Sequence, residues 1–436
     1  MSDSAVENSP SFLVSNFRPD LAPYEDLYRE LHRHPDVSKH EAATASTVAK
    51  VLRSLPDIDV ITDIGGHGLV GILRNGQGPT VMLRAELDAL PMLEQTDLPY
   101  AATSRAQDPR DGPSQPAMHA CGHDMHMAGL LASAKLLHRA SEHWSGTVVF
   151  LFQPDEENGA GAQCMVEDGL YDPKKHAVPH PDIVLGGHVM PMRAGTIATR
   201  RGAFNSTSES LRVTFYGHGG HGAKPHKAVD PVLMACSAVL KLQTIVSRET
   251  DPQQMAVVTV GSIHAGNAPN VIPEEATLLI NTRSFSTSLQ ESVRDSIRRI
   301  VFAESEAFRA PKPPSIERIT FFPLLYNDPS ATATLEQSMR HHFGAGFLLE
   351  IPASTGSEDI SNLAAPSSAP VSFWNYGGIC PDEWDGALEQ GPTERIPANH
   401  NPKFAPVIQP TLTVATDAYA LAALTFLKIR SPQSVE

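Results

Sequence analysis

The chain has 436 residues, of which 41% are hydrophobic and 19% are charged, and its formal net charge is −15 at pH 7. This length predicts two domains, and the composition is that of a folded protein. The negative charge argues against nucleic acid or an anionic membrane as a partner. With no membrane-length apolar run, no secretory signal pattern and only four cysteines, we expect a cytoplasmic protein.

The first half of the chain alternates apolar runs with segments of helical spacing. A loose tail is expected over residues 1–16. The predicted elements that follow are a helix at Leu21–His34, strands at Leu69–Leu73 and Thr80–Arg84, a helix at Met127–Arg139, and strands at Thr147–Phe152 and Ile183–Leu185. Strands that alternate with helices predict a doubly wound α/β domain.

From residue 208 the pattern changes to a strand-helix-strand-strand-helix-strand order. The segments are Leu211–Tyr216, Pro231–Ser247, Ala256–Ile263, Ala276–Asn281, Leu289–Phe308 and Ile316–Phe321. This order predicts a ferredoxin-like α+β domain at 208–322, inserted into a first domain that covers 17–207 and 323–436. The first domain ends with a predicted helix at Thr411–Leu427.

The densest group of metal-ligating residue types lies at Met118–His126, which reads M-H-A-C-G-H-D-M-H. A thiol and imidazoles this close together suit a borderline cation such as Zn²⁺. The acidic pair Glu156-Glu157 and His188 come just after predicted strands, and His400 follows near the C-terminus. Open α/β sheets place their sites at the carboxyl ends of strands. We therefore expect a metal site there, with one spare carboxylate for proton transfer.

These motifs give the chain a family resemblance. It resembles the dinuclear metallopeptidases and amidohydrolases of the aminoacylase and carboxypeptidase type, and most of all the hippurate hydrolase and auxin-amino-acid-conjugate hydrolase subgroup. The resemblance spans nearly the whole chain in seven ordered motifs: L-H-R-H-P-D (Leu31–Asp36), R-A-E-L-D-A-L-P (Arg84–Pro91), M-H-A-C-G-H-D, F-Q-P-D-E-E, G-H-G-G-H-G-A-K-P-H (Gly217–His226), N-V-I-P (Asn270–Pro273) and N-H-N-P-K-F (Asn399–Phe404).

The resemblance implies a site with two divalent metal ions, Zn²⁺ or Mn²⁺. Cys121 is implied to bridge the two metals, with His123 and His188 on one and Glu157 and His400 on the other. We interpret His119 and His126 as core or supporting histidines instead of ligands.

The resemblance also implies roles around the metals. Glu156 is the implied general base, and Asp88 orients a ligating imidazole. His221 stabilises the oxyanion in the partner subunit's site, and Asn270 and Arg283 bind the polar end of the substrate. A turn histidine and a surface arginine are the plainer interpretations of His221 and Arg283. The inserted domain is then the dimerisation or lid domain of a homodimer.

Two departures from the subgroup pattern accompany the resemblance. Position 86 is Glu where the subgroup commonly has Asp, which puts the geometry around the ligands in question. The segments at 103–117 and 380–397 look longer than usual, and either shape the substrate mouth or are surface insertions.

The predicted activity is metal-dependent hydrolysis of an N-acyl or N-aroyl amino acid, or of a small dipeptide, at an amide next to a free carboxylate. Two alternatives stay open. One is an enzyme of a specialised pathway that hydrolyses or forms an amide with the same site. The other is a metal-binding pseudoenzyme that acts as a dimeric interaction partner, which the intact Glu156 disfavours.

Overall fold

The computed structural model describes residues 9–103, 105–106, 114–348, 351–391 and 396–430. The chain forms two compact units. The first comprises residues 1–202, 326–352 and 359–436, and the second comprises residues 203–325 and 353–358. The predicted insertion at 208–322 lies within the second unit.

The first unit is built on a mixed sheet. Its four central strands, in the order β6-β3-β7-β18, run parallel, whereas β1, β2 and β8 join it in antiparallel pairs. The predicted doubly wound parallel pattern thus describes only the centre of the sheet. The described strands are β1 (Ile58–Ile64), β2 (Gly68–Asn75), β3 (Thr80–Glu86), β6 (Trp144–Gln153), β7 (Ile183–Arg193), β8 (Ile197–Thr199), β17 (Phe347–Leu348), β18 (Val371–Ile379) and β19 (Lys428–Ile429).

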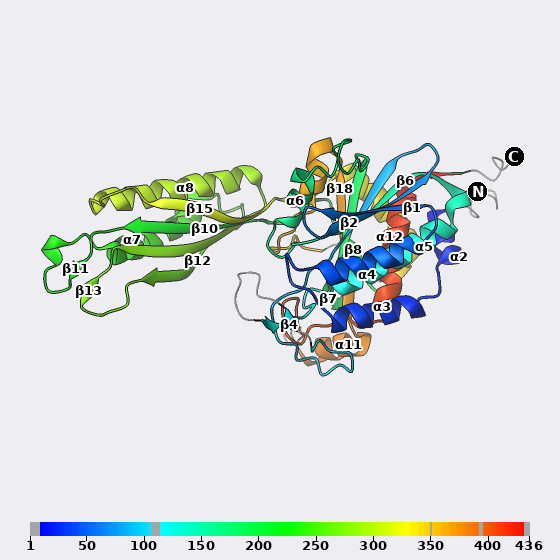
Figure 1. Cartoon of the computed structure of the whole chain (residues 1–436), viewed down its shortest axis with the longest axis horizontal. Helices are drawn as coiled ribbons and strands as arrows, with labels where there is room; N and C mark the ends of the chain where they lie inside the picture. Colours follow the sequence, from blue (N-terminus) through cyan, green and yellow to red (C-terminus); the bar gives the residue numbers. More distant parts are fainter. Residues whose placement is uncertain (1–8, 104, 107–113, 349–350, 392–395, 431–436) are drawn as a thin grey trace. The chain divides into compact units, whose positions relative to one another are not determined.

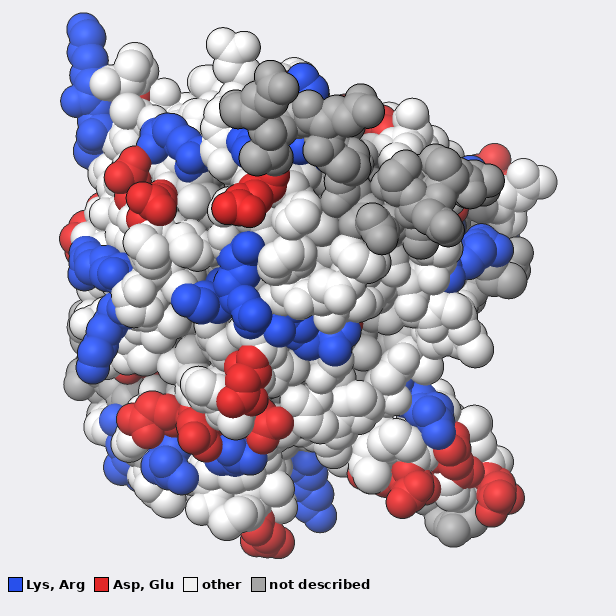
Figure 2. Space-filling model, turned by 90° about the vertical axis from the view of Figure 1, so that its right-hand side faces the viewer, with Lys and Arg blue, Asp and Glu red and all other residues white. Residues whose placement is uncertain are grey.

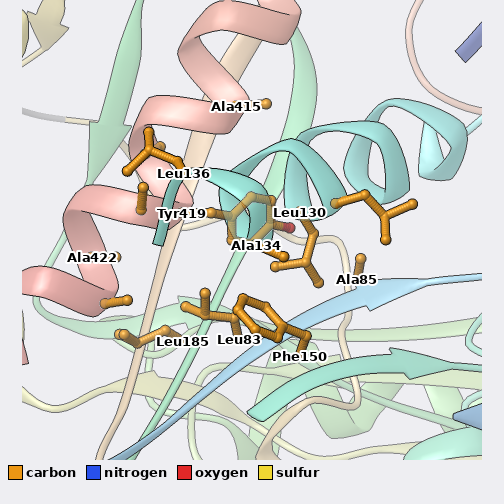
Figure 3. Packing of buried hydrophobic residues seen from close by; sticks show 14 of the residues in the cluster. Leu83, Ala85, Leu130, Ala134, Leu136, Phe150, Leu185, Ala415, Tyr419 and Ala422 are labelled. Atoms are coloured by element: carbon orange, nitrogen blue, oxygen red, sulfur yellow. The ribbon is translucent and has the colours of Figure 1, made fainter. Parts of the chain in front are cut away.

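Helices α5 and α12 pack against the centre of this sheet (Figure 1). Figure 3 shows Leu83, Phe150 and Leu185 of the strands facing Leu130 and Tyr419 of these two helices. The two helices approach closely, because a Cβ atom at Gly129 would lie 2.7 Å from that of Ala415. The helices of this unit are α2 (Pro10–Phe17), α3 (Ala22–Arg33), α4 (Ala42–Arg53), α5 (His123–Arg139), α6 (Gly161–Glu167), α9 (Pro329–Phe343), α10 (Ser361–Ala364), α11 (Pro381–Gln390) and α12 (Thr411–Phe426).

Several element boundaries differ from the sequence-based expectation. The expected loose tail contains α2, which is capped by the Ser9 side chain and buries Leu13 and Val14. Strand β7 continues through His188 instead of ending before it. The segment 380–397, for which no helix was expected, contains α11, while its residues 392–395 lie outside the described residues. The segment 103–117 includes strands β4 (Arg105–Ala106) and β5 (Gln115–Pro116); its residues 104 and 107–113 are also outside the description.

The second unit contains a four-stranded antiparallel sheet in the order β12-β14-β10-β15. Side chains of β14 alternate between buried and more exposed positions, which is the pattern of a sheet with one covered face. Its elements are β10 (Thr207–Tyr216), β11 (Gly220–His221), α7 (Pro231–Thr244), β12 (Ala256–Ala265), β13 (Val271–Ile272), β14 (Glu275–Ser284), α8 (Thr287–Ala307) and β15 (Ser315–Phe322). Without the short pair β11-β13, their order is β-α-β-β-α-β (Figure 1).

The surface carries both kinds of charge. Figure 2 shows acidic and basic side chains interspersed over one face of the molecule. Among the described residues, none of the helices combines the length and the apolar character needed to cross a bilayer.

Candidate metal centre

Cys121 lies at the centre of a group of potential metal ligands in the first unit. Its Sγ atom is 3.3 Å from Nε2 of His188 and 3.3 Å from Nε2 of His400. His123 belongs to the same group as Cys121 and His188, and Glu157 belongs to a second group with Cys121 and His400. The structure therefore brings together all five residues implied as ligands, in two groups that share the thiol.

The backbone explains how these ligands converge. Gly122 has a φ of +84° and immediately precedes α5, so the chain turns sharply between Cys121 and His123. A side chain at Gly122 would also collide with Val189, because its Cβ would lie 2.3 Å from Val189 Cγ1. His400 has a φ of +66°, and its amide donates to the carbonyl of Ala120 at 2.9 Å. This bond holds the C-terminal ligand against the Cys121 loop.

Two imidazoles are oriented with a ring nitrogen left for a cation. His123 Nδ1 lies 2.9 Å from the carbonyl oxygen of Asp88, and His188 Nδ1 lies 2.8 Å from that of Val189. A carbonyl only accepts, so Nδ1 carries a hydrogen in both rings, and Nε2 is the nitrogen that can coordinate a metal once it is unprotonated. Nε2 of His123 is buried and has no hydrogen-bond partner among the described residues. A divalent metal would satisfy that atom.

Asp88 forms hydrogen bonds with one residue from each of the two groups of ligands. Its Oδ2 atom accepts from the backbone amide of Glu157 at 3.0 Å and from the Ser38 hydroxyl at 2.8 Å. Its own carbonyl accepts from His123. The side chain is buried, and contact with His123 outweighs burial and lowers the pKa of Asp88. Asp88 therefore supports ligands of both groups as an anion.

The electrostatics of this region favour a bound cation. Burial lowers the pKa of His123, but Asp88, Glu86 and Glu157 outweigh burial and raise it to about 10. Burial, with Glu157 and Glu156 nearby, raises the pKa of the Cys121 thiol well above its usual range. Positive charge is thus stabilised here, and the thiol loses its proton only when a cation arrives.

Glu156 lies beside the ligands. It is 7% exposed, and its Oε2 atom lies 3.9 Å from Nε2 of His123. Glu156, Glu157 and His123 together form one of the potential metal-binding groups. The pair of adjacent carboxylates thus reaches the same imidazole, and one carboxylate can ligate while the other handles protons.

Sequence analysis misses one buried contact next to the ligands. His126, interpreted there as a core or supporting residue, places Nδ1 2.6 Å from Oε2 of Glu86 and accepts the Val189 amide at Nε2 at 2.9 Å. Glu86 also pairs with the buried Arg84. Glu86, which stands where the subgroup commonly has Asp, therefore contacts both His126 and Arg84. The spacing of the residues gives no signal of the contact between His126 and Glu86, because His126 lies on α5 and Glu86 lies on β3.

The remaining predicted site residues belong to the second unit. His221 on β11 pairs with Val271 of β13, and the carbonyl of Asn270 accepts the Gly222 amide at 2.8 Å, so His221 and Asn270 are close. Arg283 lies elsewhere, on β14, where it donates to the carbonyl of Thr355 at 2.5 Å. Both His221 and Asn270 are exposed, whereas Arg283 is partly buried.

Comparison with known proteins identifies the family. The model of peptidase family M20/M25/M40 matches residues 82–413. Thermostable carboxypeptidase 2 of Saccharolobus solfataricus is 31% identical over 95% of this chain and 99% of its own. Hippurate hydrolase of Campylobacter jejuni is 37% identical over 64% of this chain and 68% of its own.

A solved structure agrees with this assignment. A Bacillus subtilis protein described as a dinuclear metal binding peptidase from the M20 family has a TM-score of 0.71 and 25% identity. The match covers 93% of this chain and 97% of that one. The donor set around Cys121 fits a pair of divalent cations. The family resemblance of the sequence is thus confirmed, and the chain belongs to peptidase family M20/M25/M40 as a metal-dependent amidohydrolase or peptidase.

Proposed function

We propose that this protein hydrolyses the amide bond of N-acyl or N-aroyl amino acids, or of small dipeptides, next to a free carboxylate. The observation that carries the proposal is the buried Glu156 beside two ligand groups that share Cys121. The related hippurate hydrolase and carboxypeptidase support this choice of substrate by their names.

The residues of the first unit supply the chemistry. When bound, two divalent metals polarise the amide carbonyl and lower the pKa of a water molecule. Glu156 accepts a proton from the attacking water as its oxygen bonds to the carbonyl carbon. Glu156 then donates this proton to the amide nitrogen, and the carbon–nitrogen bond breaks. Glu157 would use its carboxylate to hold a metal and would not be available to carry this proton.

The donor set bears on which metals bind. The thiol of Cys121 and the imidazoles favour Zn²⁺, whereas the carboxylate of Glu157 also suits Mn²⁺. We propose one of these two as the native metal.

The second unit is proposed to bind substrate. Arg283 suits the substrate carboxylate through its two-pronged guanidinium. Asn270 is proposed to bind the same polar end of the substrate, and His221 to stabilise the oxyanion. Arg283 and Glu275 are eight residues apart on β14, which corresponds to about 27 Å at the usual rise of a strand. Asn270 precedes Glu275 at the other end of β14 from Arg283. Because one small substrate does not span both ends of the same strand, this separation supports a site in which the two groups come from different copies of the chain.

An exposed apolar surface supports a homodimer. Leu233 and Leu240 of α7 are 56% and 75% exposed, and Ile263 of β12 is 48% exposed. Strand β12 is also an edge of its sheet, with backbone groups available to a second copy. Apolar side chains beside an open strand edge favour a symmetric pairing of two such units.

Kinetic measurements on two variants test the proposal. Metal-loaded protein is assayed against N-acetyl, N-benzoyl and indole-acetyl amino acids. Glu156→Gln keeps both metals but loses roughly 10²–10⁴-fold in kcat, because an amide cannot carry the proton. Glu157→Gln instead loses metal from one site. A loss of less than about tenfold in Glu156→Gln overturns the proposed base.

A further inference from the structure

The loop that carries Glu156 is held by a residue far away in the sequence. Glu41 is fully buried just before α4. Its Oε1 atom accepts two backbone hydrogen bonds, from the amide of Lys39 and from that of Asp155, each at 2.8 Å. Asp155 directly precedes Glu156. One carboxylate oxygen therefore joins the segment before α4 to the loop after β6.

Both amides belong to residues in an unfavourable backbone conformation. Lys39 has a φ of +71° and Asp155 a φ of +52°, in the left-handed region that non-glycine residues rarely adopt. Such a conformation is unfavourable and persists only where its surroundings hold it. A buried amide that loses its hydrogen-bond partner also destabilises the fold. The bond to Glu41 therefore selects the left-handed turn at Asp155.

That turn sets where the Glu156 carboxylate goes. Beyond it, the Gly159 amide donates to the carbonyl of Glu156 at 2.7 Å, and the Gly161 amide donates to that of Asp155 at 3.1 Å. These bonds fix the part of the loop that follows Asp155. The bond to Glu41 fixes the Asp155 amide itself, so without Glu41 only the bonds from Gly159 and Gly161 hold the turn.

We propose that Glu41 is a positioning residue that fixes the Glu156 carboxylate by accepting the hydrogen bond from the Asp155 amide. This inference rests on the proposed role of Glu156 as general base. Glu41 acts on the geometry of the loop, because its Oε1 atom accepts the hydrogen bond that holds Asp155 in place. It does not contact substrate or metal.

The charge of Glu41 is not needed for this role. Burial and the nearby Asp88 raise the pKa of Glu41 to about 7, so the neutral form is readily available. The second oxygen, Oε2, is buried and has no hydrogen-bond partner among the described residues. A glutamine has the same length and the same acceptor oxygen, and can therefore replace Glu41. An aspartate is one methylene shorter and cannot reach both amides.

Three variants separate positioning from simple loss of stability. In metal-loaded protein, Glu41→Ala lowers kcat by about 10–100-fold, the cost of misplacing a catalytic group by about 1 Å. KM changes less than about threefold and the metal content stays the same. Glu41→Asp keeps a buried carboxyl group, but it also lowers kcat. Glu41→Gln recovers kcat to within about threefold of the wild type.

Asp417→Ala is the matched control. Asp417 is also a buried carboxylate of the first unit, but its partners are Arg18 and His342. This variant loses thermal stability while its kcat per metal-loaded protein is retained. If Glu41→Asp behaves like this control, or if Glu41→Gln is as impaired as Glu41→Asp, the positioning role is wrong.

A double variant keeps this inference separate from the proposed function. If Glu41 acts through Glu156, adding Glu41→Asp to Glu156→Gln causes no further loss of kcat. An undiminished further loss shows that Glu41 acts elsewhere and overturns the inference. If Glu156→Gln alone retains turnover, the proposed base itself fails, whatever the Glu41 variants do.

Discussion

The backbone amide of Glu157 donates a hydrogen bond to Oδ2 of Asp88 at 3.0 Å, while the carbonyl of Asp88 lies 2.9 Å from Nδ1 of His123. The side chain of Asp88 thus orients Glu157, a ligand of one proposed metal site, and its main-chain carbonyl orients His123, a ligand of the other. Partners that orient a ligand typically contribute 10–100-fold in metal affinity. The two sites are therefore expected to weaken together when this residue is changed.

Asp88→Ala tests that relationship. The variant lacks the acceptor for the Glu157 amide and also the Oδ1 atom that lies 3.4 Å from Nδ1 of His123, so we expect the affinity for both metals to fall by roughly 10–100-fold. The measurement is metal content by mass spectrometry after dialysis against a graded chelator. Asp59→Ala is the control, because Asp59 is an exposed carboxylate that pairs with Arg74 at the surface. Loss of one metal with the other at full affinity would show that Asp88 supports a single site.

Metal binding is expected to release a proton from Cys121. Because the pKa of the metal-free thiol is raised well above its usual range, the thiol is protonated at neutral pH and becomes a thiolate when it ligates. Apparent metal affinity therefore rises with pH. Titration of metal into weakly buffered protein measures the released protons. Cys121→Ala should release about one proton fewer and bind less metal, and an unchanged release would exclude the thiol as a ligand.

His32 is expected to make stability depend on pH. Burial lowers its pKa, but hydrogen bonds to Asp124 at 2.7 Å and Glu94 at 3.1 Å outweigh burial and raise it to about 9. The folded protein therefore binds a proton that the unfolded chain releases near pH 6.5. The stabilisation is complete below pH 6.5 and is lost as pH rises to about 9. It is worth at most roughly 3 kcal/mol.

Denaturant unfolding of the wild type and of His32→Gln across this range measures the effect. Glutamine cannot titrate, so the difference in free energy of unfolding between the two proteins should shrink from pH 6.5 to pH 9. A difference that stays constant over the range would mean that His32 is neutral in the folded protein.

Subunit mixing tests the proposed homodimer. His221→Ala and Glu156→Gln are each expected to be nearly inactive alone. In a mixed dimer, one of the two sites combines an intact Glu156 with the partner's intact His221. Random exchange makes half of the dimers mixed, so activity should approach roughly a quarter of the wild type. If exchange is demonstrated and no activity returns, His221 acts within its own chain or not at all.

The sequence predicts which side chains gather around Cys121 better than it predicts the elements that carry them. Cys121 and His123 stand out because their side-chain chemistry is readable without a structure. By contrast, α5 begins at His123, four residues before the predicted start at Met127, and β7 runs through His188. The prediction stops short because polar residues look like the ends of elements, whereas here they are buried against one another.

Glu41 shows a different limit of sequence reasoning. A single glutamate between a lysine-histidine pair and two alanines reads as a solvated residue. Its role depends on the amide of Asp155, which is 114 residues away along the chain. Because backbone amides are the same at every position, no residue type marks such a partner.

The strand order has a consequence for how the protein is made. Strand β18 lies between β7 and β8 in the sheet, although the whole segment from β9 (Gly202–Asn205) to α9 separates it from them along the chain. A nascent chain that ends before residue 371 therefore has an open gap in its first sheet, while β10 to β15 are already complete. The second unit can fold on the ribosome first. The cysteine loop is synthesised well before His400, so we expect the proposed metal site to be complete only after residue 400 has been added to the chain.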